Sequence, residues 1–264
     1  MDRQVNELPR NLFDLRGKVA LVNGGSRGIG EASARALAAH GARVIVTSRK
    51  LAACEEVAER IRAAGGECQA KACHAGDLEQ LQALFGEIER EYGRLDILMN
   101  NAATTGHYGP ILDTELAAFD KVMETNVRGF FYSCVYGIKL MAKNGGGSII
   151  NTASVFGIRP GWGEGAAIYS ISKSAIITLT KTFANECAQL GVRVNALLPG
   201  LTQTKLAGAL LEDDSTRNAM LANVPMGRAA QPEEMAGSVV YLASNASSYV
   251  TGSLTIVDGG YTIN

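Results

Sequence analysis

The fold of this chain is set by the stretch Lys18-Val-Ala-Leu-Val-Asn23-Gly24-Gly25-Ser26-Arg27-Gly28-Ile29-Gly30. The part up to Asn23 is a short apolar run, which is typical of a strand buried on both faces of a parallel sheet. The glycines allow a tight turn and a close approach to a phosphate, at the start of a helix expected from about Gly28 to His40. The spacing is G-x-x-x-G-x-G instead of the common G-x-G-x-x-G, but it meets the same requirement. It therefore predicts a dinucleotide-binding turn, with a plain turn as the alternative.

Strands and helices alternate along the rest of the chain. Apolar or β-rich runs predict further strands at 42–47, 67–73, 95–99, 148–152, 192–197 and 253–257. Helical periodicity or position predicts helices at about 51–61, 78–88, 114–143 (a break near 125–126 is an open alternative), 169–190 and 232–244. This order predicts an α/β fold: a single-domain, Rossmann-type, doubly wound parallel sheet of about seven strands with helices on both faces. Residues 1–264 are expected to form one domain, with 1–14 as an N-terminal extension.

The composition, with 47% hydrophobic and 19% charged residues, is that of an ordinary soluble globular protein. A net charge of -1 without a Lys/Arg block argues against nucleic acid or an anionic membrane as the main partner. No apolar run reaches the roughly 20 residues that span a bilayer, and the start lacks the apolar core of a signal peptide, so we expect a cytoplasmic protein. Five cysteines without a C-x-x-C pair and three isolated histidines predict neither a disulfide framework nor a metal site.

A pair of residues suited to proton transfer follows the fifth predicted strand. Tyr169 and Lys173 are four positions apart and would lie on one face of a helix. The lysine ammonium would lower the pKa of the phenol from its reference of about 10, which makes it a general acid or base near neutral pH. Ser154, just after the strand at 148–152, could reach the same point. Such a pair is more often a surface contact, so its interpretation depends on the rest of the chain.

The end of the second predicted strand bears on the type of dinucleotide. An acidic residue there would bind a ribose 2'-hydroxyl and repel a 2'-phosphate. This chain has Ser48, Arg49 and Lys50 instead. The guanidinium of Arg49 suits a phosphate, and Arg27 could approach from the glycine turn. NADP is therefore favoured over NAD, and the alternative is that Arg49 and Lys50 merely solvate a helix start.

With these residues in place, the chain resembles the classical short-chain dehydrogenase/reductase family over nearly its whole length. The segments that carry the resemblance are Gly24/Gly28/Gly30, Asn100-Asn101-Ala102, Asn126, Ser154, Tyr169, Lys173, Pro199-Gly200 with Thr204, and Val257-Asp258-Gly259-Gly260. Each segment alone is a modest signal, but together and in order they are specific.

The resemblance implies a role for each catalytic residue. Tyr169 would protonate a carbonyl oxygen or take the alcohol proton, and Ser154 would hydrogen-bond the same oxygen. Lys173 would bind the nicotinamide ribose and lower the pKa of Tyr169, and Asn126 would hold a water that links Lys173 to solvent. The implied NADP(H) contacts are Gly24, Ser26, Arg27, Gly28, Ile29, Gly30, Ser48, Arg49, His74, Asn100, Asn101, Ala102, Tyr169, Lys173, Pro199, Gly200, Leu201, Thr202 and Thr204.

The chain also departs from the family pattern. Asn23 replaces a usual threonine, Ala103 replaces a usual glycine, and His74 replaces an aspartate that usually contacts adenine, which leaves that side-chain contact open. Ser154 and Tyr169 are fifteen positions apart, two more than is usual in the family. The longer loop carries the single tryptophan, Trp162, as a candidate substrate contact; packing under the loop or at a subunit contact is the alternative.

The expected function is that of an oxidoreductase that transfers hydride between NADP(H) and a carbonyl or secondary-alcohol substrate. Residues from about 201 to 221 would form a substrate lid with an apolar inner face, in which Leu206 is a candidate substrate contact. The alternatives are a 3-oxoacyl-carrier reductase, an NAD-dependent alcohol or sugar-acid dehydrogenase, and a non-catalytic dinucleotide sensor. Tyr132 and Asn185 stand where carrier-linked reductases present arginines, which lowers the first alternative. The resemblance implies a homotetramer, with a dimer as the alternative.

Overall fold

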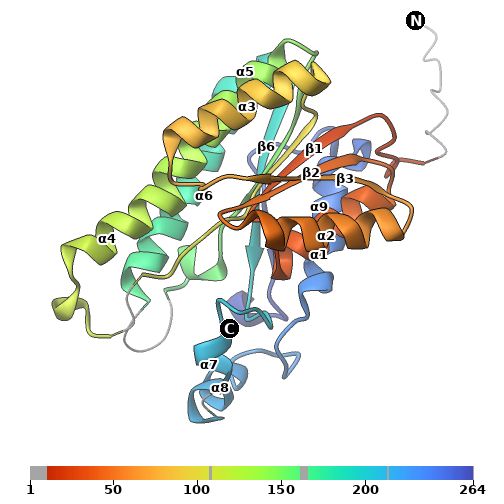
Figure 1. Ribbon diagram of the computed structural model, residues 1–264. Coiled ribbons are helices and arrows are strands. Elements are labelled where there is room, and N and C mark those ends of the chain that lie inside the picture. Colours follow the sequence, from red (N-terminus) through yellow and green to blue (C-terminus); the bar gives the residue numbers. More distant parts are fainter. Residues whose placement is uncertain (1–10, 107–108, 161–165, 213, 264) are drawn as a thin grey trace, which may run out of the picture.

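The computed structural model describes residues 11–106, 109–160, 166–212 and 214–263. Their centre is one sheet of seven parallel strands in the order β3-β2-β1-β4-β5-β6-β7 (Figure 1). The strands are β1 Val19–Asn23, β2 Arg43–Ser48, β3 Glu67–Ala72, β4 Ile97–Asn100, β5 Gly147–Thr152, β6 Val192–Pro199 and β7 Leu254–Val257. The predicted fold class is confirmed. Residues 1–10, part of the expected N-terminal extension, lie outside the described residues.

Helices cover both faces of the sheet (Figure 1). They are α1 Gly28–Ala39, α2 Leu51–Ala63, α3 Leu78–Tyr92, α4 Leu116–Val122, α5 Gly129–Ala142, α6 Ala167–Cys187, α7 Gly208–Glu212, α8 Asp214–Leu221 and α9 Ala236–Ala243. One apolar core lies between the sheet and α3, α5 and α6, and a second core lies between the sheet and α1, α2 and α9. The central strands β1 and β4 are fully buried, which explains why their apolar runs were recognisable in the sequence.

The long helical region differs from its prediction in detail. Its interior is a π-helical segment, Met123–Arg128, between α4 and α5, so the helix is widened at this point and not broken. The segment packs closely on the loop after β3: a Cβ atom on Gly129 would lie 2.1 Å from the carbonyl oxygen of Ala75. The helices α7 and α8 were not predicted, because five and eight residues are too few for a clear periodicity.

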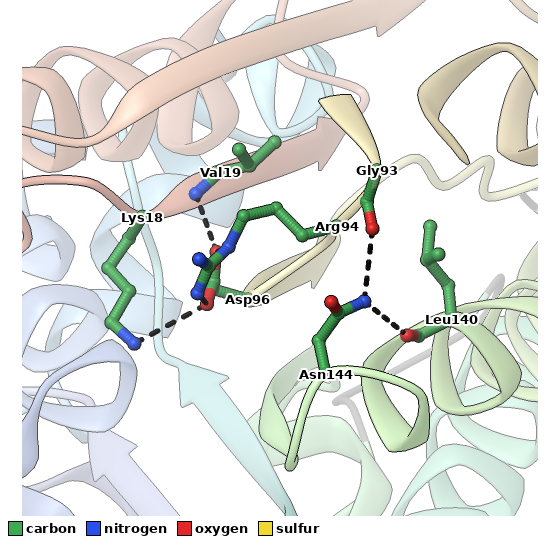
Figure 2. Close-up of polar contacts among 7 residues, drawn as sticks. All are labelled: Lys18, Val19, Gly93, Arg94, Asp96, Leu140 and Asn144. Atoms are coloured by element: carbon green, nitrogen blue, oxygen red, sulfur yellow. Dashed lines mark hydrogen bonds and ion pairs between the residues drawn. The ribbon is translucent and has the colours of Figure 1, made fainter. Parts of the chain in front are cut away.

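The amino ends of β1 and β4 are joined by the carboxylate of Asp96 (Figure 2). Asp96 accepts hydrogen bonds from Val19 N at 2.9 Å and from Arg94 Nε and Nη2 at 2.9 and 2.6 Å, and Lys18 Nζ lies 3.4 Å away. Burial alone would raise the pKa of this carboxyl, but the hydrogen bonds from Arg94 and Val19 outweigh it and keep the pKa below its ordinary value. The ion pairs of Asp96 therefore stabilise the amino ends of the central strands. The candidate site lies at the opposite, carboxyl ends of the strands.

Candidate active site

The glycine turn packs between β2 and β4. The amides of Gly24 and Gly25 donate to Thr47 O at 2.8 and 3.0 Å, and Asn101 Nδ2 donates to Gly24 O at 3.0 Å. Gly24 has a φ of +79°, and a Cβ atom on it would lie 2.6 Å from Ala102 N. A Cβ atom on Gly30 would lie 2.1 Å from Gly24 O. A side chain at either glycine would push the turn away from the sheet, so this geometry requires glycine.

A cavity of about 690 Å³ opens at the carboxyl ends of the strands, next to this turn. That volume suits a small-molecule or cofactor site at the switch point of an open α/β sheet. The predicted site residues that line it are Gly24, Ser26, Arg27, Gly28, Ile29, Ser48, Arg49, His74, Asn101, Ala102, Ser154, Tyr169, Lys173, Pro199, Gly200, Leu201, Thr202, Thr204 and Leu206. Three others, Gly30, Asn100 and Asn126, are absent from the lining, and Trp162 lies outside the described residues.

The lining is cationic. Its charged side chains are Arg27, Arg49, Lys121, Lys173 and Lys205, and no aspartate or glutamate belongs to the described lining. The side chains of Arg27 and Arg49 make no hydrogen bond or ion pair within the described parts of the chain, and both residues are exposed. Two unpaired guanidinium groups on the wall of a cavity without carboxylates are well suited to bind phosphate.

A row of buried polar side chains runs beneath the cavity and includes Asn100. Asn23, Thr47, Asn100 and Asn151 occupy paired positions on β1, β2, β4 and β5. Thr47 Oγ1 donates to Asn23 Oδ1 at 2.9 Å, Asn23 Nδ2 to Asn100 Oδ1 at 3.1 Å, and Asn100 Nδ2 to Asn151 Oδ1 at 3.0 Å. Asn100 therefore braces the strands that carry the site, and the unusual Asn23 is an integral part of the row.

Asn126 lies in the π-helical segment and is fully buried. Its Oδ1 accepts from Thr104 N at 2.9 Å, and its Nδ2 donates to Thr104 O at 2.9 Å and to Ser172 Oγ at 3.0 Å. Ser172 Oγ in turn donates to Tyr169 O at 2.7 Å. Asn126 thus ties the loop after β4, which lines the cavity through Thr104, to the helix that carries Tyr169.

Ser154 follows β5 and caps the short 3-10 helix Val155–Gly157. Its Oγ accepts a hydrogen bond from Phe156 N at 3.2 Å. Because the hydroxyl acts as an acceptor in this cap, its own hydrogen remains available to a group in the cavity. The ring of Phe156 also meets the ring of Tyr169 edge to face, with 6.4 Å between centroids, so the cap helps to place the tyrosine.

Lys173 is fully buried on α6 below Tyr169. Its Nζ donates to Thr152 O at 2.7 Å and lies 5.5 Å from the centroid of the Tyr169 ring and 5.4 Å from that of Phe130. Burial disfavours the charged ammonium and lowers the pKa of Lys173 to about 7. Thr152 O is its one hydrogen-bond partner in the described residues, so an ammonium here has hydrogens left for a bound ligand.

Several lining residues carried no distinguishing signal in the sequence. Thr104 and Thr105 come from the loop after β4, and Tyr261 comes from the 3-10 helix Tyr261–Ile263; only the fold brings these segments to the cavity. Lys205 directly follows the predicted Thr204. Lys121 lies one turn before Thr125, which also lines the cavity, so helical spacing could have linked that pair.

The cysteines and histidines form no metal cluster in the described ranges, and all five thiols are free. Cys73 does line the cavity, but burial raises the pKa of its thiol to about 12 and keeps it protonated. His74 also lines it, and its Nδ1 accepts from Gly76 N at 3.0 Å, so this side chain shapes the loop after β3.

Comparison with known proteins places these features in a family. A family model described as "Enoyl-(Acyl carrier protein) reductase" matches residues 24–262. Dehydrogenase/reductase SDR family member 4 of Oryctolagus cuniculus is 36% identical over 246 residues, which are 93% of this chain and 94% of that protein.

Two solved structures agree with this chain throughout the fold. A short-chain type dehydrogenase/reductase from Mycobacterium marinum is 37% identical, with a TM-score of 0.92 over 96% of this chain and 98% of that chain. A putative NAD(P) dependent gluconate 5-dehydrogenase from Beutenbergia cavernae, solved with bound NADP at low occupancy, is 35% identical, with a TM-score of 0.92 over 96% of this chain and 100% of that chain. The chain therefore belongs to the classical short-chain dehydrogenase/reductase (SDR) family of oxidoreductases.

Proposed function

We propose that this protein transfers hydride between NADP(H) and a carbonyl or secondary-alcohol substrate, with Tyr169 as the general acid/base. The observation that carries the proposal is that one cavity joins the glycine turn to Ser154, Tyr169 and the buried Lys173. The sequence left open that Tyr169 and Lys173 are only a surface pair. A surface pair would not have its lysine buried beside a cavity whose cationic wall can bind phosphate.

The residues present fit a dinucleotide. Gly24 lines the cavity without a side chain, so the backbone of the turn can approach a pyrophosphate at the start of α1. Arg27 and Arg49 would hold phosphate groups, and Lys173 would hold the nicotinamide ribose. The predicted contacts from Pro199 to Thr204 would hold the nicotinamide. When bound, the nicotinamide supplies or accepts the hydride.

The side chains of this protein would handle the substrate oxygen and its proton. Ser154 would donate its hydroxyl hydrogen to the carbonyl oxygen and so polarise the bond. Tyr169 would give a proton to that oxygen in reduction and take one from it in oxidation. Lys173 would stabilise the phenolate form of Tyr169 by its charge. Asn126 would hold a water between Lys173 and solvent through one of its own oxygen atoms, Oδ1 or the main-chain oxygen. Both hydrogens of its Nδ2 are already donated.

NADP is proposed over NAD because of charge. Ser48 and Arg49 follow β2 and line the cavity where an acidic residue would select a ribose 2'-hydroxyl. The bound NADP in the solved relative from Beutenbergia cavernae supports this choice. We also propose that 1–264 act as one domain, with 201–221 as the substrate lid, since Leu206 lines the cavity and α7 and α8 follow it.

A carrier-linked acyl substrate is the second candidate, because the matching family model is described by an acyl carrier protein reductase. Such a carrier is acidic, and cations would be needed beside the cavity mouth. Tyr132 and Asn185 supply none at the positions noted above. An acyl thioester therefore belongs in the substrate panel, but a free carbonyl compound is favoured. A catalytically silent sensor is disfavoured because Ser154, Tyr169 and Lys173 are all kept.

The proposal is tested by following NADPH oxidation with a panel of ketones, aldehydes and an acyl thioester. Tyr169→Phe should lower kcat by about 100-fold to 10,000-fold, the usual contribution of a general acid/base. The matched control is Tyr249→Phe, because Tyr249 is fully exposed and away from the cavity. Turnover that is unaffected by Tyr169→Phe would overturn the mechanism.

Assembly and location complete the proposal. A homotetramer is supported by exposed apolar side chains on α4, α5 and α6 and by the edge position of β7 in the sheet. None of the helices in the described residues is long and apolar enough to cross a membrane. We propose a cytoplasmic location on a different ground, the five free thiols, which a reducing compartment would preserve.

A further inference from the structure

The end of the cavity next to Ser154 is apolar. Val155, Val224 and Tyr261 form a small buried cluster, and Phe156 packs against it. All four residues line the cavity, and Val155 directly follows Ser154 in the chain. Leu206, Ala207, Ala219 and Met220 from the lid region line the same cavity. A carbonyl compound held by Ser154 and Tyr169 would therefore place a substituent against apolar side chains.

Tyr261 reaches this cluster from the C-terminal segment after β7, in a turn that is held firmly. Asp258 accepts hydrogen bonds from Gly260 N at 2.9 Å, Thr262 N at 2.8 Å and Thr262 Oγ1 at 2.7 Å. Met226 N donates to Gly259 O at 3.0 Å, which ties the turn to the segment after α8. Tyr261 itself is only 4% exposed. Its ring is thus a fixed part of the cavity wall.

Arg159 holds the ring from behind. Its Nη1 donates to Tyr261 O at 2.9 Å, and its guanidinium carbon lies 4.8 Å from the centroid of the Tyr261 ring. Arg159 is not part of the cavity lining. It therefore acts on the site through Tyr261, as a positioning residue, and does not offer its charge to a substrate.

The cations that line the cavity lie near the glycine turn, near the loop after β3 and beneath Tyr169. Arg27 and Lys205 also line a second cavity of about 280 Å³ beside the glycine turn, which places Lys205 on the phosphate side. Lys121 lies one turn before Thr125, whose Oγ1 would be 3.3 Å from a Cβ atom on Gly76, in the loop after β3. Lys173 is buried against Thr152 O. Among the described residues, no cation belongs to the cluster of Val155, Val224 and Tyr261, so a substrate carboxylate buried against it would lose its hydration without gaining an ion pair from the cluster.

We propose that Tyr261 is a wall of the substrate site and that this end of the cavity selects carbonyl compounds with an apolar substituent over polyhydroxylated acids. This inference rests on the proposed function, because it takes Ser154 and Tyr169 as the place where the carbonyl oxygen sits. It distinguishes a simple carbonyl or secondary-alcohol substrate from the sugar-acid alternative that the sequence left open.

The test measures two properties across the methyl ketones from 2-butanone to 2-octanone, with 5-keto-gluconate as the polar comparison. The first is kcat/KM with NADPH. The second is the affinity of each ketone for the protein with NADP⁺, in which ketone and cofactor are both oxidised and no turnover occurs. Each buried methylene contributes about 0.8 kcal/mol, or three- to fourfold. We therefore expect both quantities to rise about threefold per methylene, and 5-keto-gluconate to be the poorest ligand.

Four variants and one control assign the effect. Tyr261→Ala should flatten the dependence of both kcat/KM and affinity on chain length. Val224→Ser, a smaller change in the same cluster, should reduce the slope in part and guards against a Tyr261→Ala variant that fails to fold. Arg159→Ala should flatten the slope as well, while Arg159→Lys, which keeps the charge near the ring, should restore part of it. Tyr249→Ala, at a fully exposed tyrosine outside the cavity, is the control.

The outcomes separate the two proposals. Absence of turnover with every carbonyl compound would refute the proposed function, while a chain-length dependence in the affinities would still support an apolar site. Turnover without a chain-length dependence, or preference for 5-keto-gluconate, would refute the apolar site alone. A slope that Tyr261→Ala and Val224→Ser leave unchanged would refute the assignment of the wall.

Discussion

Lys173 combines two demands that oppose each other. The proposed mechanism needs a cation below Tyr169, but burial of an ammonium costs free energy and lowers its pKa to about 7. In the unfolded chain the lysine would titrate near its ordinary value of 10.5. Below pH 7 both states carry the proton, and the folded state bears the full cost. Between pH 7 and 10.5 the unfolded state binds more protons, so the stability of the fold rises with pH.

We therefore expect Lys173→Met to lower kcat by at least about 100-fold. We also expect the variant to be more stable than the parent near neutral pH, by a margin that is smaller in alkali. The stability advantage of the variant should shrink by about 2 to 3 kcal/mol between pH 7 and pH 9, from the linkage of one buried lysine. Denaturant unfolding of both proteins at the two pH values checks this. A difference that does not change with pH would mean that Lys173 titrates normally. Lys181→Met, at an exposed lysine of the same helix, is the control.

In the proposed function, Arg49 would select NADP over NAD. Arg49→Glu places a carboxylate at the end of β2, where it would repel a 2'-phosphate and accept from a ribose hydroxyl. We expect NADPH to bind at least about tenfold more weakly and NADH to bind equally or more tightly. Titration of both cofactors, with Arg90→Glu on the exposed face of α3 as the control, measures the change. Tighter binding of NADH than of NADPH by the unaltered protein would contradict the proposed preference for NADP.

The row of polar side chains across β2, β1, β4 and β5 is a property of neighbouring strands. Asn151 accepts from Asn100 Nδ2 at 3.0 Å and donates to Thr180 Oγ1 on α6 at 3.1 Å. Asn151→Leu would remove the acceptor of Asn100 Nδ2 and the donor to Thr180 Oγ1 from a buried site, which costs about 1 to 3 kcal/mol for each group. We expect a loss of about 2 to 5 kcal/mol in the free energy of unfolding, measured with denaturant. Asn218→Leu, at an exposed asparagine of α8, should be close to neutral, and equal effects of the two changes would contradict this role.

Asp96 joins β1 to β4 at the opposite end of the same strands (Figure 2). Its pKa is held below the ordinary value, so its ion pairs stabilise the fold above the unfolded pKa of about 4, and this contribution is lost as pH falls through the folded pKa. Asp96→Asn should destabilise the protein at pH 7, and the difference from the parent should diminish below about pH 4. Thermal unfolding from pH 7 downward tests the sign. A stability difference between parent and variant that grows as pH falls would contradict the depressed pKa of Asp96.

Strands and helices were predictable where burial gives a regular pattern. The runs at β1 and β5 are apolar because both faces of those strands are covered, and α3 shows a clear stripe through Leu81, Leu84, Phe85 and Ile88. The π-helical segment was predicted only as an alternative break, because its close packing near the distant loop at Ala75 leaves no local pattern in the sequence. The hydrogen bonds of Asn126 to Thr104 and the place of Tyr261 in the cavity wall depend on long-range packing, for which local spacing gives no signal.

The proposed homotetramer would account for the exposed apolar side chains on α5 and α6. Ile171 on α6 is 50% exposed and Phe131 on α5 is 44% exposed, and Phe131 stacks edge to face on Phe183 with 5.1 Å between centroids. α5 and α6 pack beside each other on one face of the sheet (Figure 1). Apolar side chains on adjacent helices form a surface that a second copy would cover in an isologous contact. The edge strand β7 offers a second, independent contact.

If two different contacts build a tetramer, a charge in one of them should leave dimers that are held by the other. If the α5/α6 face forms a two-fold contact, Ile171→Glu would bring two like charges into it, so we expect tetramers to dissociate to dimers with little loss of monomer stability. Light scattering coupled to size-exclusion chromatography measures the mass directly. Leu51→Glu, at a comparably exposed leucine of α2 on the other face of the sheet, should leave the assembly intact. A tetramer that tolerates Ile171→Glu would show that the α5/α6 face lies outside the interface, and a parent protein that is already dimeric would limit the assembly to one of the two contacts.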